Sequence, residues 1–144
     1  MYMRTRLRNN ERGAALLETA ITIPIILLIC VGIFEFGRAY QTWQVLTNAA
    51  REGARVAILS DKTDAEVKTA VQDYMKVGGL PGYATAGVVI DRTIPLGVNT
   101  GSKITVNYPF SFMVLNGVAK LVSKGSTAGK PLTMQSIAIM RNEI

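Results

Sequence analysis

The sequence predicts an α+β fold with a long N-terminal helix, a second helix and a small antiparallel sheet. An apolar run near the N-terminus continues past Phe34, without a proline, into an amphipathic helical pattern. A second helical period covers 64–77, and apolar and polar residues alternate strictly over 103–112. The chain has 144 residues, which is enough for one domain plus an anchor.

Charge is distributed unevenly along the chain. Sixteen Lys and Arg stand against ten Asp and Glu, which gives a net charge of +6. Half of this excess lies in the first 13 residues, which hold Glu11 and four arginines, Arg4, Arg6, Arg8 and Arg12. The remainder is nearly balanced, so no basic stripe is expected on a folded face and no nucleic-acid partner is expected.

Histidine and cysteine are scarce. The chain has no His and a single Cys, Cys30. This composition excludes an intramolecular disulfide, zinc sites of the Cys/His kind, and catalysis by a Ser-His-Asp or Cys-His arrangement. The commonest general base is also missing. We therefore expect a protein that is not an enzyme and that has no metal, no catalytic residues and no cofactor.

The apolar run is long enough to cross a membrane. Residues 14–34 contain one charge, Glu18, and about 20 mostly apolar residues span a bilayer core. The large apolar side chains between 19 and 37 favour insertion by roughly 3–7 kcal/mol. The arginines that precede the run predict a single pass with the N-terminus in the cytoplasm and the C-terminal part outside.

Two other interpretations of this segment are weaker. A cleavable secretory signal could end at Gly37-Arg38-Ala39, but its apolar core would be too long and the helical pattern runs through that point. A buried core helix would need more protein around it than the remaining chain supplies. The sequence therefore predicts a leader at 1–13, a retained membrane helix at 14–37 and an extracytoplasmic α+β domain at 38–144.

Beyond the membrane segment the same helix continues to Leu59. From Ala14 it would measure roughly 69 Å. Apolar or small residues recur on one face, at Ala39, Trp43, Leu46, Ala50, Gly53 and Ala57. Small residues that allow close packing crowd this half, namely Ala49, Ala50, Gly53, Ala54 and Ala57. Gly53 either lets the protein's own sheet approach the helix or contacts a neighbouring subunit.

The start of the apolar run has a distinctive spacing. Gly13, four apolar residues and then Glu18 stand behind a short basic leader. This pattern resembles the processing site of type IV pilin precursors, and the resemblance implies cleavage by a prepilin peptidase between Gly13 and Ala14. The new ammonium group of Ala14 could then pair with the Glu18 carboxylate of the same or a neighbouring subunit.

A second stretch narrows the resemblance. Glu35-Phe36-Gly37-Arg38, followed by the segment 46–55 (LTNAAREGAR), resembles TadE-like proteins, the pseudopilins or minor pilins of tight-adherence (Tad/Flp) type IV pili. The resemblance implies a pilin-like fold, a bacterial inner-membrane location and incorporation into a surface pilus. It also implies three kinds of partner, which are the peptidase, other pilin-like subunits with the pilus assembly machinery, and membrane lipid.

Residues 14–144 form a longer mature chain than the very short major pilins of this branch, which favours a minor subunit. The alternative function is a single-pass membrane anchor that carries an extracytoplasmic binding or scaffold module and never polymerises. The spacing of Gly13 and Glu18 discriminates between the two functions, because a simple anchor does not need it.

The C-terminal part supplies the second helix and the strands. Thr63 and Glu66 predict a capping box in front of the helix 64–77. Strands are expected at 87–93, 103–112 and 132–141, the first two joined through 96–101. Pro109 restricts its part of the strand to an edge or a strand end. Residues 112–129 are compatible with either a short helix or a loop near the bilayer.

Overall fold

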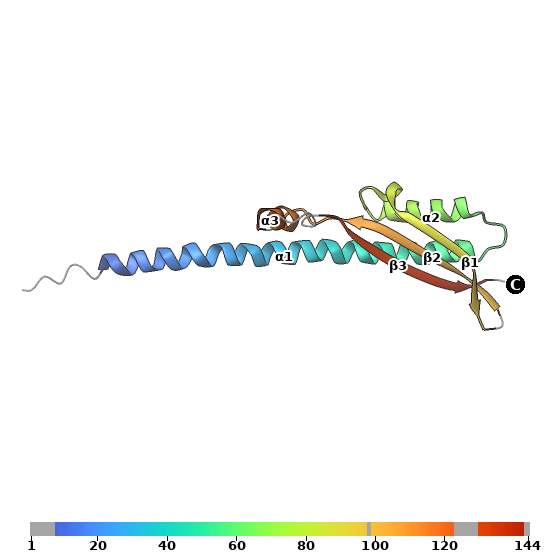
Figure 1. Cartoon of the computed structure of the whole chain (residues 1–144), viewed down its shortest axis with the longest axis horizontal. Helices are drawn as coiled ribbons and strands as arrows, with labels where there is room; N and C mark the ends of the chain where they lie inside the picture. Colours follow the sequence, from blue (N-terminus) through green and yellow to red (C-terminus); the bar gives the residue numbers. More distant parts are fainter. Residues whose placement is uncertain (1–7, 98, 123–129, 143–144) are drawn as a thin grey trace, which may run out of the picture.

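One long helix carries the rest of the molecule. The computed structural model describes residues 8–97, 99–122 and 130–142. Helix α1 (Arg8–Ala57) is a rod of 50 residues. Figure 1 shows that the second helix and the sheet pack along its C-terminal half, while its N-terminal half extends away from them. The predicted α+β class is therefore confirmed.

Helix α1 differs from the predicted helix 14–59 at both ends. It begins six residues earlier, because no proline precedes Gly13 and one glycine costs a helix only about 1 kcal/mol. It ends two residues earlier, at Ala57, where the Arg92 side chain donates a hydrogen bond to the Ala57 carbonyl over 2.9 Å. Pro24 lies inside α1 and does not end it.

Helix α2 (Asp64–Val77) has the predicted bounds. The capping box is also confirmed, because the Thr63 hydroxyl accepts a hydrogen bond from the Glu66 backbone N–H while the Glu66 carboxylate accepts one from the Thr63 backbone N–H. The chain then turns through Gly79 and Gly82, whose φ angles of 73° and 71° are readily adopted by glycine.

The sheet has three antiparallel strands in the order β1-β2-β3, namely β1 (Gly87–Leu96), β2 (Asn99–Phe110) and β3 (Leu132–Arg141). The third strand matches its prediction. Strands β1 and β2 extend further into the predicted linker 96–101, because Leu96 already pairs with Asn99. The turn between them is therefore only two residues long, and the second of these, Val98, lies outside the described residues. Pro109 stands near the end of the central strand and pairs only with Thr133 of β3.

The undecided segment 112–129 contains a short helix, α3 (Leu115–Val122), and residues 123–129 lie outside the described part. A single 3-10 turn, η1 (Tyr83–Thr85), precedes the sheet. Figure 1 shows α3 beside α1 and away from the sheet, on the side of the N-terminus. The hydrogen bond from Val114 N–H to Glu35 places the start of α3 at that level of α1.

The core lies between α1, α2 and the inner face of the sheet. The central strand runs back along α1, from Ser102 near Ala57 to Phe110 near Arg38. The inner positions of β2 are almost completely buried, as its alternation predicted. The buried core residues are Leu46, Ala49, Ala50, Ala54, Ala57, Val67, Val71, Met75, Leu80, Ala86, Ile104, Val106, Tyr108 and Phe110.

Trp43 does not take the buried position expected from the helical spacing. Its side chain is 48% exposed, whereas the neighbouring Thr42 is buried. The reason is that the buried face of α1 passes through Thr42 and Leu46, so Trp43 lies beside that face. The spacing of apolar residues therefore misplaces the buried face by one position here.

Gly53 lies where three elements meet. A Cβ atom at this position would clash with Val71 Cγ2 of α2, and it would lie 3.4 Å from Ile104 Cγ2 of β2. The close approach therefore comes from the chain's own second helix as well as from its sheet. Gly37, in the same helix, would meet nothing within 4 Å.

We predict that Gly53→Leu lowers the free energy of unfolding by roughly 1–3 kcal/mol, because the larger side chain must push α2 away from α1. Thermal unfolding of the full chain in detergent micelles, followed by circular dichroism, measures the effect. Gly37→Ala is the matched control and should unfold at the wild-type temperature or slightly higher, since alanine favours a helix. An unchanged melting temperature for Gly53→Leu would contradict the packing described here.

Candidate functional site

The expected processing segment lies inside the first turns of α1. Gly13 and Ala14 are exposed, and a Cβ atom on Gly13 would meet nothing within 4 Å. Glycine in a helix interior costs about 1 kcal/mol relative to alanine. In contrast to Gly53, the packing of the described residues gives Gly13 no role.

Glu18 is exposed, one helical turn beyond Ala14 and on the same face of α1. Its backbone carbonyl accepts a hydrogen bond from the Thr22 hydroxyl over 2.7 Å. Among the described residues no ion pair involves its carboxylate. The geometry therefore leaves this carboxylate available to a cation at the start of the helix.

The small residues of α1 lie inside the domain. Ala49, Ala50 and Ala54 are completely buried, and Ala57 is 2% exposed. They belong to the core that α2 and the sheet form with α1. Their contacts in this structure are therefore made within one chain.

A buried carboxylate marks the junction between the two halves of α1. Glu35 is 0% exposed. Its Oε2 accepts a hydrogen bond from Arg38 Nη1 over 2.8 Å, and its Oε1 accepts one from the Val114 backbone N–H over 2.6 Å. Glu35 thus fastens the chain before α3 to α1, and we call this arrangement the Glu35 clamp. The sequence analysis missed the clamp, although an acid ending an apolar run with an arginine three positions later was a usable signal.

Three phenylalanines extend this junction. The Phe36 and Phe112 rings meet edge to face with 6.3 Å between centroids, and the Phe112 and Phe110 rings do so at 5.1 Å. The guanidinium carbon of Arg38 stands 5.4 Å from the centroid of the Phe110 ring, within cation–π range. Ion pairing and ring packing therefore hold the end of β2 against the same turn of α1.

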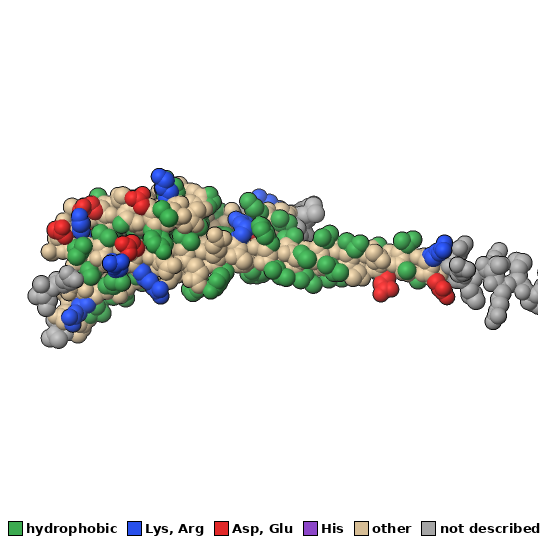
Figure 2. Space-filling model, turned by 180° about the vertical axis from the view of Figure 1, so that it is seen from behind, with side chains coloured by type: hydrophobic (Ala, Val, Ile, Leu, Met, Phe, Trp, Pro, Cys, Tyr) green, Lys and Arg blue, Asp and Glu red, His purple; other side chains and the backbone are tan. Residues whose placement is uncertain are grey.

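The N-terminal half of α1 is apolar on every side. It is long and apolar enough to cross a membrane, and its most apolar window of 18 residues is 0% buried. Figure 2 shows hydrophobic side chains along the visible face of this half, with charged side chains over the domain and towards the N-terminal end. Exposure of so much apolar surface is costly in water, which makes lipid or other helices its natural surroundings.

A comparison with protein families identifies the helix that carries these features. The family model described as TadE-like protein matches residues 13–55. The segment from Gly13 to Arg55 is TadE-like. This match confirms the resemblance seen in the sequence. No curated protein and no solved structure matches the chain.

The TadE-like segment contains Glu35 and Arg38 of the clamp and four of the five small residues packed in the core. Ala57, Val114, α2 and the whole sheet lie outside it. It begins at Gly13, the residue that precedes the expected cleavage point. The match therefore covers most of the apolar half of α1 and most of its packed half, while α2, α3 and the strands are described by the structure alone.

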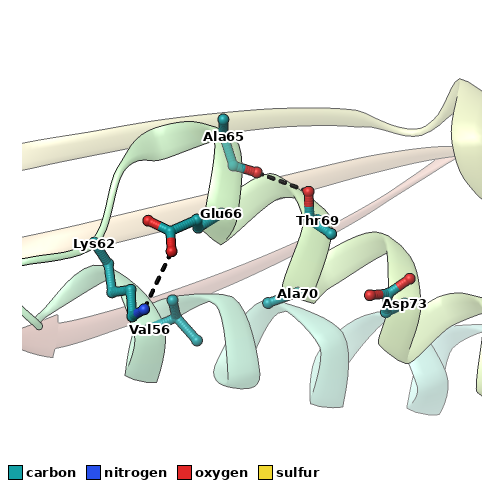
Figure 3. A pocket seen from close by; sticks show the side chains of 7 residues that line it. All are labelled: Val56, Lys62, Ala65, Glu66, Thr69, Ala70 and Asp73. Atoms are coloured by element: carbon teal, nitrogen blue, oxygen red, sulfur yellow. Dashed lines mark hydrogen bonds and ion pairs between the residues drawn. The ribbon is translucent and has the colours of Figure 1, made fainter.

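A shallow groove of about 430 Å³ lies where α2 crosses α1. Figure 3 shows Lys62 and Glu66 at one end and Asp73 at the other, with small side chains on its floor. Lys62 Nζ donates to Glu66 Oε1 over 3.1 Å, so these two charges are engaged with each other. Within the described residues no group of His, Cys, Asp and Glu side chains could hold a metal ion.

Arg92 is a second residue that the sequence analysis did not single out. It stands on β1 and donates to Asp64 Oδ1 over 2.9 Å, and to the carbonyls of Ala57 and Lys62 over 2.9 and 2.8 Å. It thereby joins the first strand to the connection between α1 and α2. Its role is to hold the domain together.

The capping box gives the domain a defined acid sensitivity. The backbone N–H of Thr63, followed by the Lys62 ammonium, holds the pKa of Glu66 at about 2, against an ordinary 4.5. The folded pKa is the lower one, so the stabilisation is complete above the unfolded pKa and is lost as the pH falls towards the folded pKa. We predict that the free energy of unfolding of the full chain in micelles falls between about pH 5 and 2, and that Glu66→Gln flattens this fall.

Urea titrations across this pH range measure the effect. Asp73→Asn provides a matched control in the same groove, because it removes a carboxylate without removing either partner of the capping box, and it should keep the fall in stability that Glu66 causes. A Glu66→Gln variant with the full wild-type pH dependence would contradict the assignment.

Proposed function

We propose that this chain is a pilin-like structural subunit of a Tad/Flp-type pilus, a pseudopilin or minor pilin, and that a prepilin peptidase removes its leader after Gly13. The observation that carries the proposal is the TadE-like segment of α1. The family match begins at Gly13, and the 21 residues that follow Gly13 contain one charged residue, Glu18. The proposed role is structural, and no residue is assigned to catalysis.

The apolar half of α1 would anchor the subunit in the bacterial inner membrane. The leader arginines favour a cytoplasmic N-terminus, and the domain would then stand outside. Before assembly the exposed apolar surface of α1 would face lipid. In a filament it would face the equivalent helices of neighbouring subunits, with no change in the domain.

Processing requires the start of α1 to unwind, because a peptidase binds its substrate in an extended form. The open surroundings of Gly13 support this step, since no packing has to be broken there. Cleavage would create an ammonium group on Ala14, one turn from the exposed carboxylate of Glu18. In an apolar filament core the two charges would be far more stable as a pair, within one subunit or between neighbours, than apart.

We predict that Gly13→Leu blocks removal of residues 1–13 and leaves the chain inserted in the membrane, because the bulky side chain obstructs the peptidase cleft and the apolar helix is unaltered. Mass spectrometry of the membrane-bound protein, from hosts with and without the peptidase, measures both effects. Gly32→Leu places the same side chain at another open position of α1 and should be processed normally. Wild-type protein that keeps residues 1–13 in a peptidase-positive host would overturn the proposed processing.

We predict that Glu18→Ala inserts as well as wild type or slightly better, because a charge at the membrane boundary is removed. It should nevertheless fail to assemble, since the Ala14 ammonium loses its partner. Membrane fractionation tests insertion, and co-purification with the pilus machinery tests assembly. Glu11→Ala, in the leader, is the control and should assemble normally, whereas normal incorporation of Glu18→Ala into the filament would overturn the assembly role proposed for Glu18.

A further inference from the structure

The spacing of two carboxylates along α1 is too short for a bilayer. Glu35 follows Glu18 by 17 positions, which corresponds to about 26 Å of helix. The hydrocarbon core of a typical bilayer is about 30 Å thick, and any tilt of α1 reduces the thickness that the helix covers. If α1 spans the membrane, one of the two carboxylates therefore lies at hydrocarbon depth.

The surroundings of Glu35 suit a position at hydrocarbon depth. Its carboxylate is completely buried, with Arg38 and the Val114 N–H as hydrogen-bond donors, whereas Glu18 is exposed. Ionised groups are tolerated at membrane depth when they are paired and shielded from lipid. The Glu35 clamp therefore permits the hydrocarbon region to extend past residue 35.

Exposed aromatic residues indicate where the hydrocarbon region ends on the side of the domain. Tyr40 and Trp43 are 62% and 48% exposed, and such residues concentrate where a membrane meets water. From Thr19 to Tyr40 the helix rises about 32 Å, which matches a bilayer core. With the boundary at Tyr40, Glu35 lies roughly 8 Å inside the hydrocarbon.

At this depth the chain before α3 adds apolar surface beside α1. Met113 and Val114 are 71% and 45% exposed, and the hydrogen bond from Val114 to Glu35 sets their level. Phe34 and Phe36 of α1 are 60% and 66% exposed at the same level. We call these four residues the junction patch. Figure 1 shows α3 alongside this part of α1, beyond the end of the sheet.

We propose that the junction patch is immersed in the acyl chains of the leaflet next to the domain, so that the segment leading into α3 forms a second, non-spanning membrane contact. The proposal rests on the membrane anchoring proposed above. Lipid is the expected occupant because the patch continues the apolar surface that surrounds the N-terminal half of α1. Lys120, the one charged residue of α3, is exposed and has a stem long enough to reach towards lipid phosphates.

Site-directed spin labels in the full chain, at one copy per phosphatidylcholine nanodisc, test this arrangement. Cys30 is the only cysteine, and it reports on the membrane span itself. In a Cys30→Ser background, Met113→Cys reports on the junction patch, and Val89→Cys, 57% exposed on the sheet, serves as the aqueous control. Collision with oxygen, which concentrates in lipid, is compared with collision with a water-soluble nickel chelate.

We expect the labels at Cys30 and at position 113 to favour oxygen several-fold over nickel, and the label at position 89 to favour nickel. A nickel-accessible label at 113 combined with a lipid-exposed label at Cys30 would overturn this proposal and leave the membrane anchor intact. A nickel-accessible label at Cys30 would overturn both this proposal and the membrane anchor. A label at 113 that is shielded from both reagents would show a protein contact in place of lipid and would also overturn the proposal.

Trp43 provides a second measurement without any substitution, because it is the only tryptophan. Lipids brominated close to the headgroup should quench its fluorescence, and lipids brominated deep in the acyl chain should quench it much less. Absence of quenching by either lipid would place the boundary closer to the N-terminus and would overturn the depth assigned to the junction patch.

Discussion

Close packing against the C-terminal half of α1 is the interaction on which the domain depends. Three strands and one short amphipathic helix bury too little surface to be stable by themselves. The alanines and Gly53 let α2 and β2 approach the backbone of α1 together, and the core forms in the space between the three. The domain therefore cannot be separated from the helix that also provides the apolar segment.

This dependence gives α1 two environments along one uninterrupted rod. Its N-terminal half is apolar all round, which suits lipid or other helices, and its C-terminal half is apolar on one face only. The transition falls at the Glu35 clamp, where a carboxylate, a guanidinium and a backbone N–H satisfy one another. An unpaired charge here would oppose both membrane insertion and the docking of the segment before α3. By pairing the charge, the clamp allows the apolar half and the packed half of α1 to meet at this point.

The structure also separates two kinds of glycine in α1. Gly53 is required by packing, since any side chain would meet Val71. Gly13 has open surroundings, so the described fold does not account for its presence. The processing proposed above would give Gly13 a role that packing does not.

Local patterns in the sequence were enough to predict α1, the capping box of α2, the third strand and the TadE-like segment, because each depends on residues that are close along the chain. They did not give the exposure of Trp43, the burial of Glu35 or the place of α3. These depend on which face of α1 the rest of the domain covers and on which residue meets Glu35 from 79 positions away. Only the tertiary structure decides such contacts, since a side chain becomes buried or paired according to what folds against it. The spacing of Glu35 and Arg38 indicates an ion pair, but it does not indicate the contact with Val114.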